Sequence, residues 1–443
     1  MICAASCSEH EIGGFFMSTN VETKQNNGVS QVLKNRFVQG ILASALFLQI
    51  GIWVRNFAVL LYVMEMTKGD AFAISMISVA EFAPIFIFSF IGGTFADRWK
   101  PKRTMIWCET LSSLSVFAVL ITLMFGTWKI VFFVTLISAI LSQFSQPSGM
   151  KLFKQHLSAE QIQLAMSIYQ TIFAIFMVLG PILGTFIFHS FGIYISIIIT
   201  GIAFLLAAAV LLFLPKDLEN DNEKKEITLL QEMLDGIKYV KKKKALTLLG
   251  LCFMAAGLGI GLIQPLGIFI VTEQLGLSKE SLQWLLTVNG AGMIVGGALA
   301  MVFAKNVAPQ KMLIIGMLGQ AIGIGIIGYS TNLWVTLTAQ LFSGLALPCI
   351  QIGINTLIIQ NSDTDFIGRV NGILSPLFTG SMVVTMSIAG SLKEMFSLST
   401  MYEGTALLFI IGLLFILPIY NLKPVIAVES EMNRKGSAVQ HES

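Results

Sequence analysis

Long apolar stretches recur along almost the whole chain, separated by short polar segments. A helix that crosses the hydrocarbon core of a bilayer needs about 20 mainly apolar residues. The stretches that meet this requirement lie near residues 37–63, 72–95, 104–125, 129–149, 163–188, 192–214, 246–271, 283–304, 311–329, 333–359, 367–391 and 401–421. The pattern therefore predicts an all-α membrane protein with twelve transmembrane helices.

The longest polar interval, near residues 215–245, divides these stretches into two sets of six. Within it, Ile227, Leu230, Leu234, Ile237 and Val240 recur at three- and four-residue spacing, which predicts one apolar face of an amphipathic helix. A basic end follows this face and would hold the helix at a membrane surface. We expect a tail, a six-helix half, this linker, a second half and a second tail, at residues 1–36, 37–214, 215–245, 246–421 and 422–443.

The two halves show weak internal similarity. Gly92 and Gly93 precede a basic turn in the first half, and Gly296 and Gly297 stand in a comparable place in the second. Related halves around a central cavity are a common plan for transporters that alternate between two open states. The similarity predicts two pseudo-symmetric six-helix halves.

Charge supports both the span count and an orientation. Only 12% of the residues are charged, against about 25% in soluble domains. Most of the 28 Lys and Arg residues fall in the tails and the even-numbered connections. Short basic loops stay on the cytoplasmic side, so both termini are expected there. The net charge of +3 gives no indication of nucleic-acid binding.

Motifs of several other function classes are absent from the sequence. The five cysteines have no metal-ligand spacing, and no disulfide framework is indicated. A phosphate-binding Gly-rich loop that ends in Lys-Ser or Lys-Thr is missing, so ATP is not expected as the direct energy source. Residues 1–36 lack a basic segment followed by an apolar core, so we do not expect them to form a signal peptide. We expect neither an enzyme nor a bound cofactor or metal.

The turn between the second and third spans carries the most specific motif. Gly93, Asp97 and Arg98 are followed by the basic residues Lys102 and Arg103. The basic residues alone could be explained as a signal that keeps this turn on the cytoplasmic side. The full pattern resembles the Gly-x-x-x-Asp-Arg signature of the major facilitator superfamily, and in particular its branch of bacterial macrolide and siderophore exporters. This resemblance implies a cytoplasmic gate at the turn, which Arg369 at the start of the eleventh span would join.

The fifth span contains Gly180, Pro181 and Gly184. A Gly-Pro pair removes a backbone donor and bends a helix, so a purely structural kink is one interpretation. The three residues also resemble the Gly-Pro-x-x-Gly signature of the exporting antiporters of this superfamily. That resemblance implies export.

Three ionisable residues lie inside spans, where burial is costly and functional roles are the default hypothesis. Arg55 and Glu81 are each eight or nine residues from the outer end of adjacent antiparallel spans, roughly 12–14 Å deep. They are predicted to meet near the midplane, either as a structural ion pair or as a proton-coupling site. Glu109, closer to the cytoplasmic end, could extend to the interface or brace the basic turn, and it is the second candidate for the proton carrier.

Polar, aromatic and methionine side chains recur on single faces of two spans, the first and the eleventh. Such a face could line a pliable pocket or serve only as a helix contact. The substrate-cavity candidates are Gln49, Trp53, Asn56, Gln146, Asn371, Ser375, Phe378 and Met382. The fourth span offers Gln146 but lacks the arginine often found there in proton-driven drug exporters.

Together, these features predict proton-coupled efflux of a hydrophobic or amphipathic small molecule by alternating access. Export of an endogenous metabolite, such as a siderophore or lipid, is the alternative substrate class. A membrane protein that binds a ligand or partner without transport is the alternative of another kind. The expected partners are the substrate, protons and the lipid bilayer. A monomer in the bacterial inner membrane is expected.

Overall fold

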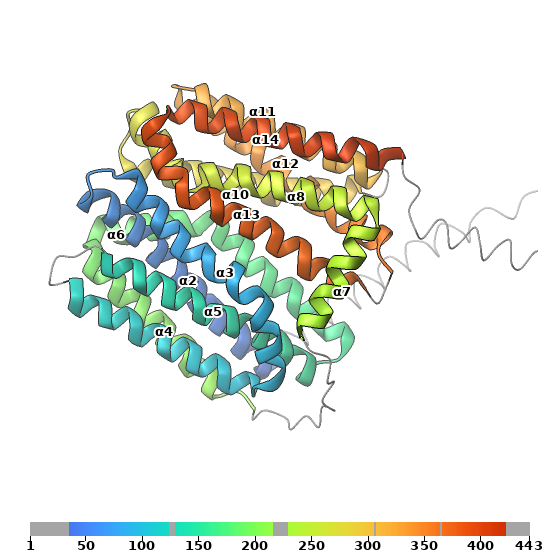
Figure 1. The fold of residues 1–443 in the computed structure, drawn as a ribbon. Helices are drawn as coiled ribbons and strands as arrows, with labels where there is room; N and C mark the ends of the chain where they lie inside the picture. The colour runs from blue at the N-terminus through green and yellow to red at the C-terminus, as the bar shows by residue number, and fades with distance from the viewer. Residues whose placement is uncertain (1–34, 124–128, 216–228, 305–306, 364–365, 422–443) are drawn as a thin grey trace, which may run out of the picture.

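The computed structural model describes residues 35–123, 129–215, 229–304, 307–363 and 366–421, and it describes the backbone alone for residues 89–98, 122, 134, 146, 159–160, 229–230, 232 and 420–421. All regular elements in these ranges are helical. The helices form two groups that lie one above the other in Figure 1, with α2–α6 in the lower group and α8 and α10–α14 in the upper group.

The lower group is the N-terminal half. Its helices are α2 (Arg36–Met66), α3 (Ala71–Arg98), α4 (Pro101–Leu123), α5 (Lys129–His156) and α6 (Ala159–Leu212). The polar linker contributes α7 (Leu229–Lys242), which lies across one end of the bundle.

The upper group is the C-terminal half. Its first span is α8 (Lys244–Ile263), which continues through the short turns η1 (Gln264–Leu266), α9 (Gly267–Phe269) and η2 (Ile270–Gln274). After η3 (Lys279–Ser281) come α10 (Leu282–Phe303), α11 (Pro309–Tyr329), α12 (Leu333–Asn361), α13 (Ile367–Met395) and α14 (Leu398–Ile416), and the last ends in η5 (Leu417–Asn421).

Eleven helices in the described ranges are long and apolar enough to cross a membrane, and α6 accounts for the twelfth crossing. Gly192 interrupts its helical backbone at φ 73°, a conformation that glycine adopts without steric cost. Gly184, before this break, lies against Phe57 of α2, and Thr200 and Phe204, after it, lie against Gly51 of the same helix. Both arms of α6 therefore run along α2 in opposite directions. The prediction of twelve spans in two halves is confirmed.

Polar side chains at the starts of several helices explain where those helices begin. An N-terminal cap supplies an acceptor for backbone N–H groups that have no partner within the helix. Asn35 accepts from the N–H of Phe37, Asp70 accepts from those of Phe72 and Ala73, and Ser158 forms a capping box with Gln161. These caps fix the entry points of α2, α3 and α6.

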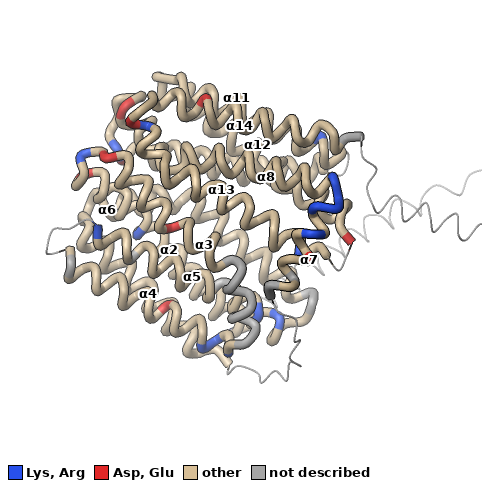
Figure 2. The backbone as a smooth tube through the Cα atoms, in the orientation of Figure 1, with Lys and Arg blue, Asp and Glu red and all other residues tan. Residues whose placement is uncertain are grey.

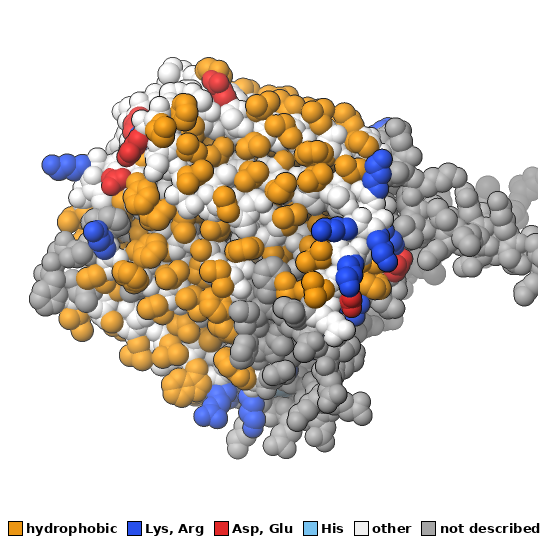
Figure 3. All heavy atoms as spheres, viewed as in Figure 1, with side chains coloured by type: hydrophobic (Ala, Val, Ile, Leu, Met, Phe, Trp, Pro, Cys, Tyr) orange, Lys and Arg blue, Asp and Glu red, His pale blue; other side chains and the backbone are white. Residues whose placement is uncertain are grey.

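The two ends of the bundle carry different elements. The linker side is the end at which α2 begins and α7 lies, and the far side is the end that holds the turn between α2 and α3. Charged residues gather at both ends (Figure 2), whereas hydrophobic side chains cover the middle of the visible face (Figure 3). This distribution is typical of a protein that spans a bilayer.

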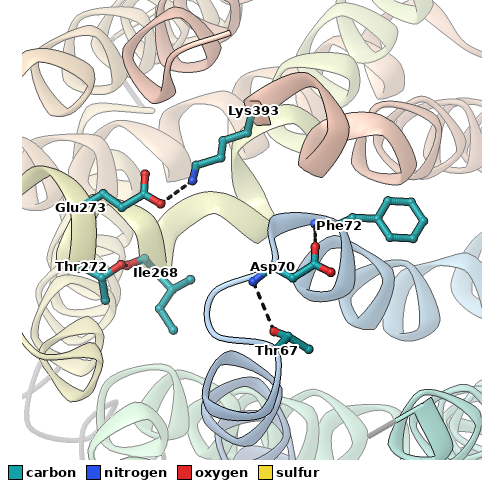
Figure 4. A network of polar contacts seen from close by, with 7 residues as sticks. All are labelled: Thr67, Asp70, Phe72, Ile268, Thr272, Glu273 and Lys393. Atoms are coloured by element: carbon teal, nitrogen blue, oxygen red, sulfur yellow. Dashed lines mark hydrogen bonds and ion pairs between the residues drawn. The ribbon is translucent and has the colours of Figure 1, made fainter. Parts of the chain in front are cut away.

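Close contacts join the two halves on the far side. Lys279 of the C-terminal half forms an ion pair with Glu65 at the end of α2. Gly390 of α13 lies so near the start of α3 that an added Cβ would come within 2.5 Å of the Phe72 Cα. Figure 4 shows the α2–α3 turn beside the ion pair of Glu273 with Lys393. The far side is therefore closed by packing and charge.

Candidate functional site

A cavity of about 240 Å³ lies inside the N-terminal half. All the residues that line it belong to α2–α6, and it extends from mid-bundle residues such as Arg55 toward the linker side at Ile41 and Phe153. Arg55, Glu81 and Glu109 all line it. The three ionisable residues that the sequence places inside spans thus share one cavity.

Arg55 is held at the mid-bundle level by hydrogen bonds. Its side chain is 5% exposed, and it donates to Ser138 Oγ of α5 and to Asn56 Oδ1, at 2.9 Å from Nη2 and 3.1 Å from Nε. Because a buried guanidinium without partners would be strongly destabilising, this network keeps the charge in place beside the cavity.

Glu81 is connected to Arg55 through an amide. Asn56 Nδ2 donates to Glu81 Oε1 at 2.7 Å, while its Oδ1 accepts from Arg55. Among the ion pairs of the described residues there is none between Arg55 and Glu81. The sequence leads us to expect the two charges at the same level, and the structure places them there with Asn56 as the bridge. A carboxylate held this way is close to a cation and still faces open space.

Glu109 occupies the linker-side part of the same cavity. Its side chain is 4% exposed and accepts a hydrogen bond from Ser145 Oγ of α5 at 2.6 Å. It is buried and faces inward, whereas the sequence also allowed it to extend to the interface or brace the basic turn. No cation pairs with it among the described residues. An inward-facing carboxyl without a counter-ion can be neutralised by a proton or by a bound cation.

Two other predicted residues of α2 have different roles. Gln49, 4% exposed, lines the cavity. Trp53 packs against Gly180, and a Cβ there would collide with the Trp53 ring. Trp53 therefore packs between α2 and α6. The side chain of the fourth-span candidate, Gln146, lies outside the described residues.

The predicted stripe on α13 lies away from this cavity. Asn371 and Ser375 are exposed, and Phe378 packs edge-on against Phe253 with ring centroids 6.2 Å apart. Met382 is 5% exposed and approaches Gly261 of α8. The part of this stripe nearest α8 thus serves helix packing, which was the other interpretation of the pattern.

Gly180, Pro181 and Gly184 lie where α6 crosses α2. An added Cβ on Gly184 would come within 2.8 Å of the Trp53 carbonyl oxygen. The backbone of α6 departs from helical geometry at Gly192 and continues as helix through Pro181. In this structure, the two glycines permit close helix contact.

The predicted gate is only partly described. The side chains of Asp97 and Arg98 lie outside the described residues, and only the backbone of α3, which contains Gly93 and extends to Arg98, is described there. Arg103 is exposed near the start of α4. Arg369 lies in the first turn of α13, with its guanidinium 4.9 Å from the Phe366 ring centroid. A gate between Asp97 and Arg369 stays a prediction.

Sequence reasoning missed the serines of α5 and the aromatic wall of α6. Ser138, Ser142 and Ser145 all line the cavity, and their spacing of four and three residues puts them on one helix face. That spacing is a signal that the sequence did contain. Tyr169 and Phe173 complete the wall from the first arm of α6, but nothing in an apolar span distinguishes them from core residues.

The comparisons with known proteins agree on the class of this fold. The model of the Major Facilitator Superfamily matches residues 41–270 and 249–438. The "Uncharacterized MFS-type transporter YkuC" of Bacillus subtilis (strain 168) is 24% identical over 411 residues, which cover 89% of this chain and 95% of that protein. The "Multidrug efflux pump Tap" of Mycolicibacterium fortuitum is 21% identical over 338 residues, covering 74% of this chain and 82% of that protein.

Solved structures of transporters share the fold. The crystal structure of the nucleoside transporter NupG superposes with a TM-score of 0.69 at 13% identity, covering 88% of this chain and 99% of NupG. A bacterial homologue of the human lysosomal transporter Spinster, in an inward-facing and unoccupied conformation, gives a TM-score of 0.59 at 14% identity, with coverage of 87% and 95%. At these identities the likeness concerns the fold alone.

Proposed function

Because the chain belongs to the Major Facilitator Superfamily and is a multi-pass membrane transporter of that type, we propose that it is a proton-coupled exporter of a hydrophobic or amphipathic small molecule. The observation that carries this proposal is the convergence of Arg55, Glu81 and Glu109 on one cavity. Burying ionisable groups in a membrane is costly, and a purely structural role would need no open space beside them.

The proton step follows from the bridge at Asn56. A carboxyl removed from water gains a proton more readily, and a nearby cation opposes this. The Arg55 guanidinium and the Glu81 carboxyl are both hydrogen-bonded to the Asn56 amide, so the positive charge lies close to the carboxyl. A substrate or a movement that changes this contact would release or capture a proton at Glu81. Glu109, which has a serine as its hydrogen-bond partner, is the second carrier in this scheme.

Side chains around the two carboxylates favour an apolar substrate. Met105, Met150 and Met166 line the cavity together with Tyr169 and Phe173. Methionine and aromatic side chains adapt to ligands of different shape. The name of the relative Tap, a multidrug efflux pump, agrees with an exporter of such compounds. An endogenous lipid-like metabolite would fit the same wall and stays the alternative substrate class.

Alternating access would use the two halves as rigid units. In the structure the far side is closed by Lys279, Glu65 and the packing of Gly390, and the cavity extends toward the linker side. We take the linker side as cytoplasmic, with both termini there, because most Lys and Arg residues fall in the tails and the even-numbered connections, which lie on that side. The conformation then corresponds to one that loads substrate from the cytoplasm.

A flux assay in proteoliposomes tests this function. A panel of hydrophobic amines, neutral amphiphiles and lipid-like acids is added to vesicles that hold the protein and a pH gradient, and a pH-sensitive dye reports proton movement. Compounds that are transported should collapse the gradient in wild type and leave it unchanged with Glu81→Gln. The matched control Glu394→Gln removes an exposed carboxylate of the other half and should behave as wild type. Failure of every compound to move would contradict the proposal, and protons that move equally with Glu81→Gln would exclude Glu81 as the carrier and leave Glu109.

A further inference from the structure

A second hollow lies on the outer surface of the N-terminal half. It has a volume of about 580 Å³ and is bounded by the start of α4, the turn before it and the neighbouring face of α5. Trp99 and Trp107 form part of its wall, and they are 46% and 55% exposed. It is separate from the central cavity, because Glu109 faces the cavity while Cys108 borders the groove.

Two basic residues stand at the linker-side end of this groove. Lys100 and Arg103 both line it and are exposed. Neither has an ion-pair partner among the described residues. Their neighbour Lys102 differs, because its ammonium group donates to the carbonyl oxygens of Leu212 and Leu214 at 2.9 and 2.5 Å. Among the described residues, the basic pair of the groove is therefore open to a ligand, whereas Lys102 serves the fold.

An apolar strip continues from the basic pair into the membrane. Arg103, Trp107, Leu111 and Leu114 follow one another at three- and four-residue spacing and lie on one face of α4. Leu111 and Leu114 are 42% and 57% exposed. Arg103 to Leu114 spans about 16 Å of helix, close to half of the roughly 30 Å hydrocarbon core. The strip thus has the length of one membrane leaflet.

We propose that this groove is a binding site for an anionic phospholipid of the leaflet on the linker side. The phosphate lies between Lys100 and Arg103, and one acyl chain follows Trp107 and Leu111 toward Leu114. Basic pockets beside transmembrane helices bind anionic headgroups, and tryptophan favours the membrane interface. The geometry selects a lipid over a soluble phosphate because the basic pair is continuous with an exposed apolar strip as long as a leaflet.

Lipid binding by the full-length protein in detergent tests this assignment, with native mass spectrometry as the measurement. The probes are phosphatidylglycerol and phosphatidylcholine with the same acyl chains. Wild type should bind phosphatidylglycerol in preference to phosphatidylcholine. Lys100→Gln should weaken phosphatidylglycerol binding by about fivefold, since each basic residue at a membrane surface contributes a factor of about that size. Lys100→Gln combined with Arg103→Gln should weaken it by about thirtyfold, because the two factors multiply.

Control variants separate a site from general surface charge. Lys241→Gln removes an exposed lysine of α7 on the same side of the bundle and should leave binding unchanged. Trp107→Ala should weaken phosphatidylglycerol binding, because it removes part of the apolar strip. In wild type, an excess of glycerol phosphate should fail to compete with phosphatidylglycerol. Equal loss with Lys241→Gln, equal binding of the two lipids, or full competition by glycerol phosphate would each overturn the proposal.

Discussion

The two halves of the molecule share a fold and differ in what fills their interiors. In the N-terminal half, charged and polar side chains surround a cavity, with Arg55 and Glu109 each about 95% buried. In the C-terminal half, glycines bring helices into backbone contact. Gly296 of α10 lies against Leu345 of α12, and Gly316 of α11 lies against Ile350 of that same helix. In Figure 2, charged positions occur along the middle of the lower group of helices, whereas those of the upper group gather near its ends.

This difference indicates that the two similar halves have different physical roles. Small residues let helices approach closely and pack firmly in a membrane, which suits a half that moves as one body. Ionisable residues pack less well in a membrane but can change their protonation, which suits the proton-coupling role that we propose for the N-terminal half. Two halves with the same helix arrangement can therefore carry different physical tasks.

The largest effect is expected at Glu81. Glu81→Gln preserves the shape of the side chain and the hydrogen bond from Asn56, but it removes the titratable group. Uphill, pH-driven transport in proteoliposomes should fall to background, while substrate binding and downhill exchange persist. If the variant still concentrates substrate at the wild-type rate, the site is structural and Glu109→Gln becomes the decisive variant.

Arg55 provides the next test, through stability. Arg55→Ala leaves Glu81 without its nearby cation and Ser138 without its donor. Breaking a buried charged network on one side costs about 3–5 kcal/mol, so the thermal midpoint in detergent should drop clearly. Arg55→Gln combined with Glu81→Gln removes both charges and should drop less. A double variant that is less stable than Arg55→Ala would show that the two residues act independently.

Packing in the C-terminal half is tested by two adjacent glycines. A Cβ on Gly296 would lie 2.7 Å from the Leu345 Cα, whereas a Cβ on Gly297 meets nothing within 4 Å. Gly296→Ala should therefore destabilise by about 1–3 kcal/mol through overpacking. Gly297→Ala should be neutral or slightly stabilising, because alanine favours helix over glycine by about 1 kcal/mol. Equal thermal midpoints for both variants would remove the packing argument for this half.

The smallest effect is expected where α7 joins the C-terminal half. Asp363 accepts hydrogen bonds from Tyr239 Oη at 2.8 Å and Lys243 Nζ at 3.0 Å. These bonds, from Tyr239 first and then Lys243, lower the pKa of the Asp363 carboxyl below its ordinary value. The folded state therefore gains stability above the unfolded pKa, near 3.9, and loses it as the pH falls through the lowered value.

Hydrogen exchange of the α7 amides checks this prediction. Protection of α7 should weaken modestly as the pH falls below about 4. Asp363→Asn should show weaker protection at neutral pH and lack this additional acid-dependent step. The contribution is small because the Asp363 side chain is 45% exposed and such surface pairs are screened by solvent. Identical acid profiles for the two proteins would show that other contacts, such as the stacked rings of Tyr239 and Phe366, hold the helix.

The number of spans and the depth of their ionisable residues could be predicted from the sequence. Length and apolar composition are enough for this, because a bilayer imposes the same requirement on each helix. The level shared by Arg55 and Glu81 followed from counting residues along two antiparallel spans. Motifs also identified the superfamily, and the match of its model to the chain confirms that.

Which side chains meet depends on how the helices pack, and the sequence could not predict this. Counting along a span gives the height of a residue, but its direction depends on how neighbouring helices rotate and pack against one another. For this reason the sequence did not reveal Asn56 as the bridge between Arg55 and Glu81, or the inward direction of Glu109. The same holds for the α13 stripe, where Phe378 packs against Phe253 and the backbone at Met382 approaches Gly261, both on α8. Helical periodicity defines a face, and the packed bundle decides what that face contacts.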